Sequence, residues 1–217
     1  MIYRLYNYLI KFLPIELINF ILYLRGIFIF LYKGNYHKPF REMKINTIIK
    51  LSSTNDLIVE TGTYLGFSTM YLSKHFKDVI SIELSKEVYE NAKKKLKKFK
   101  NIKLYNEDSS LFLKNFFLNK NNLDISFYLD AHYMSSVDLL SNNTNPILEE
   151  LEIILNNISK LRNFTIFIDD SYSYMSNKKK YESNQYLDQI YIAAKKYNLN
   201  FVISVDLIII SNKGINL

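Results

Sequence analysis

The sequence has no cysteine, only five glycines and three prolines, and no uninterrupted apolar run long enough to cross a membrane. Without cysteine the chain has no disulfide, no thiolate metal ligand and no cysteine nucleophile. This fits a reducing compartment and predicts a cytoplasmic location. The first 33 residues are the most apolar, but Glu16, Asn19 and Arg25 interrupt them. Because a central arginine costs several kcal/mol in a bilayer, we expect no membrane span there.

The amino-terminal part, residues 1–50, is predicted to be a separate helical segment. Two roles stay open for it: a cap that packs on the following domain or forms a homodimer face, or a helix that lies in a membrane interface. In the second case the protein would sit at the inner face of the membrane. Residues 51–217 are predicted to form one domain.

The net charge is +7, which can indicate nucleic acid, anionic lipid or an acidic substrate as a partner. Many lysines fall within residues 86–100. Apolar residues recur there at helical spacing, which predicts a helix whose lysines form a solvated face. We therefore do not expect nucleic acid as a partner.

From about residue 54 onward, short apolar runs alternate with amphipathic stretches. The predicted strands are 56–60, 79–83, 102–106, 124–130, 164–169, 201–205 and 207–211. The predicted helices are 66–76, 86–98, 109–119, 145–160 and 184–197. This alternation is typical of an α/β, Rossmann-like fold, with a mostly parallel seven-stranded sheet and helices on both faces.

The last two predicted strands break the alternation, because only Asp206 separates them. That is too short for a helical crossover, so they form an antiparallel hairpin or share one bent strand. The sheet is thus expected to have a reversed final strand.

A glycine loop follows the first predicted strand, in IVETGTYLGFS (58–68). It matches neither the dinucleotide fingerprint nor a phosphate-binding P-loop. Glu60 at its start would repel a pyrophosphate and attract a cationic ligand. Glu83 ends the second strand, where a carboxylate can accept hydrogen bonds from ribose hydroxyls. Asp108 follows the third strand and can accept from an adenine amine, with the Ser109 backbone nearby.

At these residues the sequence resembles the class I S-adenosylmethionine-dependent methyltransferases. VETGTYLGFST looks like the family's first motif, ISIEL like the second and NEDS like the third, and the resemblance covers about residues 55 to 211. Among these enzymes it is similar to bacterial O-methyltransferases of small molecules and glycans. The resemblance implies S-adenosylmethionine as the methyl donor, held by Glu60, Gly62, Thr63, Gly66, Ser68, Glu83, Asp108, Ser109 and Asp130.

The chemistry would take place at the ends of the fourth and fifth strands, which read YLDAHY and FIDDSYSY. In one mechanism, Asp130, Asp169 and Asp170 bind Mg²⁺, which lowers the pKa of the acceptor hydroxyl. In the other, His132 or Asp130 is the general base and no metal is needed. Residues 135–144 and 171–183 are predicted to be long loops beside this centre.

The expected reaction is methylation of a hydroxyl on a small molecule or saccharide, as in natural-product or polysaccharide biosynthesis. Adenine and cytosine N-methylation typically uses an Asn-Pro-Pro-aromatic run, which this sequence lacks. Two alternatives stay open. One is another transfer from an S-adenosyl ligand, such as aminopropyl transfer. The other is a non-catalytic protein that senses a ligand or assembles at a membrane surface.

Overall fold

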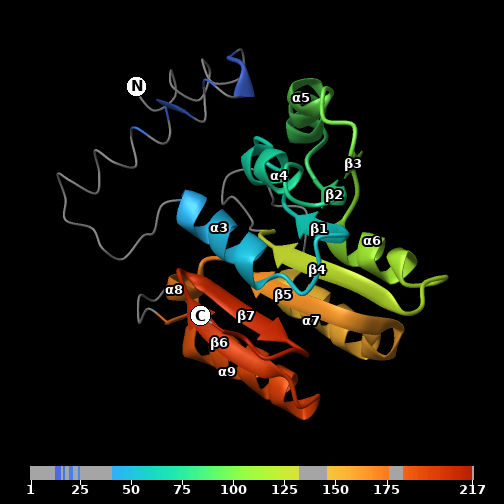
Figure 1. Ribbon diagram of the computed structural model, residues 1–217, viewed down its shortest axis with the longest axis vertical. Coiled ribbons are helices and arrows are strands. Elements are labelled where there is room, and N and C mark those ends of the chain that lie inside the picture. Colours follow the sequence, from blue (N-terminus) through green and yellow to red (C-terminus); the bar gives the residue numbers. More distant parts are fainter. Residues whose placement is uncertain are drawn as a thin grey trace.

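The computed structural model describes residues 13–15, 17, 20–21, 24, 41–131, 146–175 and 183–216. A single sheet of seven strands forms the centre of these residues, in the order β3-β2-β1-β4-β5-β7-β6 (Figure 1). The strands are β1 (Leu57–Thr61), β2 (Asp78–Ile82), β3 (Ile102–Tyr105), β4 (Leu123–Leu129), β5 (Leu161–Ile168), β6 (Asn200–Ser204) and β7 (Leu207–Ser211).

Strands β1 to β5 are parallel, and β7 pairs antiparallel with both β5 and β6. Ser204 pairs with Leu207, so Val205 and Asp206 form a two-residue turn. Both have positive φ, 52° and 62°, as a type I′ hairpin requires. The predicted hairpin and the reversed final strand are therefore confirmed.

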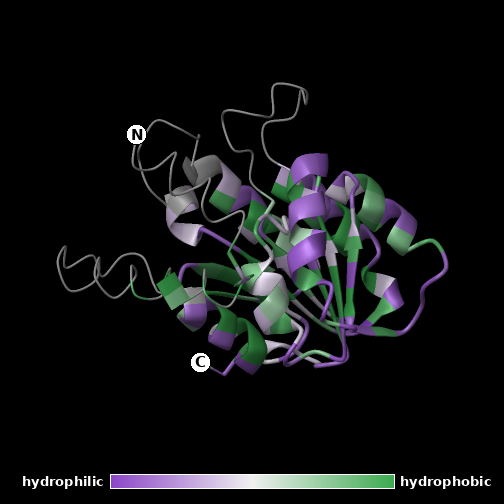
Figure 2. Ribbon diagram, turned by 90° about the horizontal axis from the view of Figure 1, so that it is seen from above, coloured by the Kyte–Doolittle hydropathy of each residue, from purple (hydrophilic) through white to green (hydrophobic). Residues whose placement is uncertain are grey.

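Helices cover both faces of the sheet. Helices α6 (Ser109–Phe116), α7 (Pro146–Asn156) and α9 (Ser183–Lys196) pack against one face through a large apolar core. Helices α3 (Arg41–Leu51), α4 (Phe67–Leu72) and α5 (Lys86–Leu96) cover the other face through two smaller clusters. Figure 2 shows hydrophobic residues concentrated in the strands and hydrophilic residues on the outer helix surfaces.

The observed elements follow the predicted order of strands and helices. Helix α5 begins at Lys86, as predicted, and Ser85 caps it by accepting a hydrogen bond from the Val88 amide. Helix α8 (Ser171–Met175) corrects part of one prediction, because this stretch was expected to be loop. Residues 135–144 lie outside the described residues.

Helix α3 falls within the predicted amino-terminal segment and packs on the sheet. Ile45 and Ile48 are 2% and 0% exposed and contact a cluster that includes Ile58 and Phe167. Burying two such side chains contributes several kcal/mol, at about 1.5–3 kcal/mol each. Packing of α3 on the sheet agrees with the alternative of a helical cap on the following domain, and the predicted division at residue 50 lies one residue before the end of this helix.

Part of the apolar segment before α3 also contacts the domain. Ile15 is 2% exposed and belongs to a cluster with Phe67, Met70 and Leu96. Among the described residues, no helix is both long and apolar enough to span a bilayer.

Candidate functional site

The glycine loop lies at the centre of the sheet, where β1 is flanked by β2 and β4 and the strand order reverses. Ligands of open α/β sheets bind at this position, outside the carboxyl ends of the strands. Gly62 has φ of 86°, and a Cβ there would lie 2.5 Å from the Asp130 carbonyl oxygen. Gly66 has φ of 79° and precedes α4. Both positions therefore favour glycine, and the first has no room for any side chain.

Glu60 lies beneath this loop and is fully buried. Its Oε2 accepts hydrogen bonds from Thr69 Oγ1 at 2.5 Å and Ser81 Oγ at 2.6 Å. Its Oε1 has no hydrogen-bond partner among the described residues. Burial raises the pKa of Glu60 to about 7, although nearby hydroxyls lower it, and the charge of Asp130 raises it further. The carboxyl group is thus poised between its charged and neutral forms at neutral pH.

The hydroxyls around Glu60 connect it to the loop. Thr63 Oγ1 lies 2.6 Å from Ser81 Oγ, which in turn donates to Glu60. The loop amides of Gly62 and Thr63 both donate to the Ile82 carbonyl at the end of β2. Glu60 therefore supports the underside of the loop, and its direct contact with a ligand stays a prediction. Ser68 is half-buried in α4.

Glu83 holds the outer side of the same loop. Its Oε2 accepts from the Tyr64 amide and its Oε1 from the Ser85 amide, both at 2.9 Å. Tyr64 has φ of 47°, an unusual conformation for a tyrosine, and this bond helps to fix it. Glu83 is only half-buried, so its remaining acceptor lone pairs lie at the rim of the loop.

Asp108 is exposed and caps α6, because its Oδ1 accepts from the Leu111 amide at 2.9 Å. Oδ1 of Asp108 thus caps the helix, and the predicted hydrogen bond from the adenine amine would go to Oδ2.

Glu150 is a functional candidate that the sequence did not reveal. It lies on α7, is 0% exposed, and its two oxygens accept from Thr61 and Ser109. Thr61 ends β1 and Ser109 begins α6, so this carboxylate ties together the two elements below the loop. The predicted ligand residue Ser109 is 9% exposed and points its hydroxyl at Glu150. Its predicted role through the backbone is still compatible with this geometry.

Asp130 follows β4 and is half-buried beside Gly62. Its Oδ2 lies 3.3 Å from the Tyr128 hydroxyl, which also donates to Asp169 Oδ2 at 2.8 Å. Burial and the two carboxylates raise the pKa of Tyr128 well above its ordinary value, so the phenol stays protonated. His132, the other predicted catalytic residue, lies outside the described residues.

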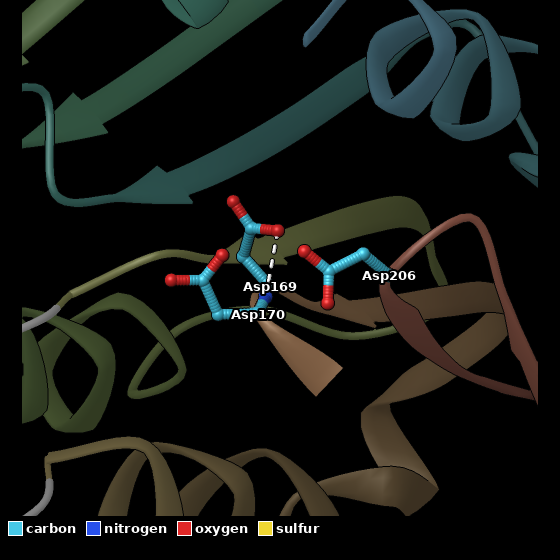
Figure 3. A group of neighbouring side chains, drawn as sticks. All are labelled: Asp169, Asp170 and Asp206. Atoms are coloured by element: carbon cyan, nitrogen blue, oxygen red, sulfur yellow. Dashed lines mark hydrogen bonds between the residues drawn. The ribbon is translucent and has the colours of Figure 1, made fainter. Parts of the chain in front are cut away.

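The structure gathers Asp169 and Asp170 with Asp206 instead of Asp130 (Figure 3). Their carboxylate oxygens lie within 4.8 Å of one another. Lys44 enters this group from α3, and its Nζ lies 2.5 Å from Asp169, 3.0 Å from Asp170 and 2.9 Å from Asp206.

This arrangement does not fit the predicted magnesium site of Asp130, Asp169 and Asp170. Mg²⁺ requires near-octahedral oxygen ligands at about 2.0–2.1 Å, and an ammonium group at their centre would repel it. Asp130 instead faces Tyr128.

No family model matches the sequence. A stretch of 66 residues, 30% of the chain, is 38% identical to ribosomal RNA small subunit methyltransferase A from Caldanaerobacter subterraneus subsp. tengcongensis. The match covers 25% of the length of that relative.

Solved structures match over most of the chain. An O-methyltransferase from Bacillus cereus in complex with S-adenosylhomocysteine has a TM-score of 0.58 at 14% identity, covering 81% of this chain and 82% of that one. The O-methyltransferase TomG from Streptomyces achromogenes, in complex with S-adenosylmethionine, has a TM-score of 0.54 at 13% identity, covering 77% of each chain. The fold is that of the class I S-adenosylmethionine-dependent methyltransferases.

Proposed function

We propose that this chain, which has the class I fold, is an S-adenosylmethionine-dependent methyltransferase that methylates a hydroxyl group of a small molecule or saccharide. One observation carries the proposal: at the strand-order reversal the glycine loop packs on the Asp130 backbone at Gly62, and the Glu83 carboxylate holds it by accepting from the Tyr64 amide. A carboxylate on the loop, that of Glu83, suits a cationic nucleoside and disfavours a phosphate. The Bacillus and Streptomyces structures, which contain donor or product, support the same ligand.

Within this proposal, each residue has a role that follows from its position. Glu83 lies at the end of β2, where it can accept hydrogen bonds from the two ribose hydroxyls. Gly62 and Gly66 allow the backbone to approach the ligand closely. Glu60, at a pKa of about 7, supplies negative charge beneath the loop when deprotonated.

When bound, S-adenosylmethionine supplies a methyl group on a positively charged sulfur. The carbon–sulfur bond breaks with its electron pair going to sulfur, and a new bond forms from the methyl carbon to the acceptor oxygen. The hydroxyl proton must pass to a base. Asp130 lies beside the loop and can accept it, and His132 is the other proposed base.

The acceptor class rests on two observations. TomG takes part in tomaymycin synthesis and the Bacillus cereus protein is an O-methyltransferase. The chain also lacks the Asn-Pro-Pro-aromatic run of base N-methylation, since its prolines are Pro14, Pro39 and Pro146. Methylation of ribosomal RNA is a second candidate, which the 66-residue match favours.

Transfer of a labelled methyl group tests these alternatives. The chain is incubated with methyl-labelled S-adenosylmethionine and separated fractions of small molecules, glycans and small ribosomal subunits. We expect label in small molecules or glycans, and we expect the Asp130→Asn variant to transfer at least about 100-fold more slowly. Label only in ribosomal RNA would establish the second candidate. Binding of the donor without transfer to any fraction would instead favour a non-catalytic ligand sensor.

A separate proposal concerns the amino-terminal segment, which we infer contacts an anionic membrane surface. Leu17, Phe20 and Leu24 are 45%, 56% and 48% exposed. Their spacing places them on one side of a helix, and the net charge of +7 favours anionic lipid. Flotation with anionic liposomes should be lost in the triple variant with Ser at these positions. A full-length chain that stays in solution, or forms a dimer through this face, would contradict the proposal.

A further inference from the structure

Lys44 makes an unusual set of contacts for a lysine. Its side chain is only 12% exposed, and its Nζ contacts a carboxylate oxygen of each of Asp169, Asp170 and Asp206. The three carboxylate oxygens within 3.0 Å of Nζ stabilise the charged form of the ammonium group.

The acids around Lys44 come from two separate junctions of the fold. Asp169 and Asp170 follow β5, and Asp206 lies in the β6–β7 turn. The turn is also fixed to the start of α8, because the Asp206 carbonyl accepts from the Ser171 amide and its Oδ1 from the Tyr172 amide. Lys44 thus joins α3 to the two junctions.

The backbone at these junctions is strained. Asp170, Val205 and Asp206 have φ of 55°, 52° and 62°. A left-handed conformation is costly for a β-branched residue such as valine. At Val205 and Asp206 the type I′ hairpin turn requires this conformation, and the turn places the Asp206 carboxylate beside Lys44. The four charged groups are therefore held in a defined arrangement.

The cluster also adjoins the proposed donor site. Gly62 packs on Asp130, whose carboxylate lies beside the Tyr128 hydroxyl, and that hydroxyl donates to Asp169. Asp169 then contacts Lys44. A continuous series of contacts thus leads from the glycine loop to the ammonium group.

We propose that Lys44 is a built-in cation that takes the place of a divalent metal ion among Asp169, Asp170 and Asp206. Three carboxylates that converge within 4.8 Å would otherwise repel one another or recruit a cation. Lys44 provides that positive charge from the chain itself and holds Asp169, which shares the Tyr128 hydroxyl with Asp130. It is a positioning residue, and its role in a metal-independent methyl transfer rests on the proposed function.

The test is a titration with Mn²⁺ followed by electron paramagnetic resonance, using the full chain. The wild-type protein should bind no Mn²⁺ at the cluster. The Lys44→Met variant removes the charge at similar volume and should gain one Mn²⁺ site, at least 10-fold tighter than any wild-type binding. The Lys44→Met/Asp170→Asn double variant should lose it again. Lys50→Met is the matched control, since Lys50 is an exposed lysine of the same helix.

Two results would overturn the proposal: a folded Lys44→Met variant that gains no Mn²⁺ site, or wild-type Mn²⁺ binding that Asp170→Asn abolishes. If Lys44→Met fails to fold, the titrations of the wild type and of Asp170→Asn still test the proposal, because Mn²⁺ binding at the cluster in the wild type would contradict it. If Lys44 only stabilised the fold, the Lys44→Met variant would lose stability and would gain no metal binding. Titration of the same samples with S-adenosylhomocysteine reports separately on the proposed function. A wild-type chain that does not bind S-adenosylhomocysteine would contradict that function and would leave the Mn²⁺ result unaffected.

Discussion

Gly62 lies directly against the backbone of Asp130, so that a Cβ on Gly62 would come within 2.5 Å of the Asp130 carbonyl oxygen and 3.2 Å of the Ala131 Cα. This contact joins the loop after β1 to the end of β4 at the position where the strand order reverses. It brings the glycine loop and the proposed base into one site.

The first prediction concerns this contact. Gly62→Ala should lower the free energy of unfolding by about 2 kcal/mol or more, because alanine is strained at φ of 86° and its Cβ meets backbone atoms that cannot rotate away. Gly214→Ala is the control, since a Cβ there has nothing within 4 Å. Equal urea midpoints for the two variants would show that the contact is looser than described.

The second prediction concerns the pH dependence that Glu60 produces. Its pKa is raised from 4.5 to about 7 in the folded protein, so between these values the folded chain binds more protons than the unfolded chain. The contribution of Glu60 to stability is therefore fully present below pH 4.5 and is lost as the pH rises through 7. A shift of this size corresponds to about 3 kcal/mol.

Urea unfolding of the wild type and of Glu60→Gln at several pH values checks this. The variant lacks the titrating group, so the wild type should lose stability relative to it as the pH rises from 4.5 to 7. A constant difference between the two proteins would mean that Glu60 titrates normally.

The third prediction concerns the buried carboxylate of Glu150. Glu150→Ala leaves the Thr61 and Ser109 hydroxyls without their acceptor in the core, and it should cost about 2–4 kcal/mol of unfolding free energy. Glu152→Ala, on the exposed side of the same helix, should change it by no more than about 0.5 kcal/mol. A similar loss in both variants would contradict the assigned role of Glu150.

The fourth prediction separates two roles of Asp108. Asp108→Ala should lose about 1 kcal/mol of stability with the helix cap, whereas Asp108→Ser should keep most of it, since serine caps well. Both variants should bind S-adenosylmethionine more weakly if Asp108 also contacts adenine. Unchanged calorimetric affinity in Asp108→Ser would show that the residue is only a cap.

The sequence predicted the order of strands and helices because each element carries its own local signal. Periodic apolar residues, the Ser85 and Asp108 caps and the single-residue gap at Asp206 are all local features. The glycine loop and its acids could be placed because they follow predicted strands directly. Pairing of those strands then brings their carboxyl ends to one edge of the sheet.

Lys44 could not be predicted, because its partners Asp169 and Asp170 lie 125 and 126 residues away in the chain. The magnesium hypothesis does not include this lysine, because two adjacent acids at a strand end carry no sign of the residue that neutralises them. Glu150 was missed for a different reason. It looked like one of several acids in the first turns of α7, yet it lies between the buried residues Ile147 and Ile154 at helical spacing. The phase of the apolar stripe could have identified it.

The most direct test of the account compares the binding of S-adenosylmethionine and ATP by calorimetry at one ionic strength. The account predicts that S-adenosylmethionine binds and that ATP does not, because the Glu83 carboxylate places negative charge on the loop. It also predicts weaker S-adenosylmethionine binding in Glu83→Gln and unchanged binding in Glu90→Gln, an exposed glutamate on α5. Binding of ATP that Gly62→Ala abolishes, or no binding of S-adenosylmethionine to the wild-type chain, would contradict it.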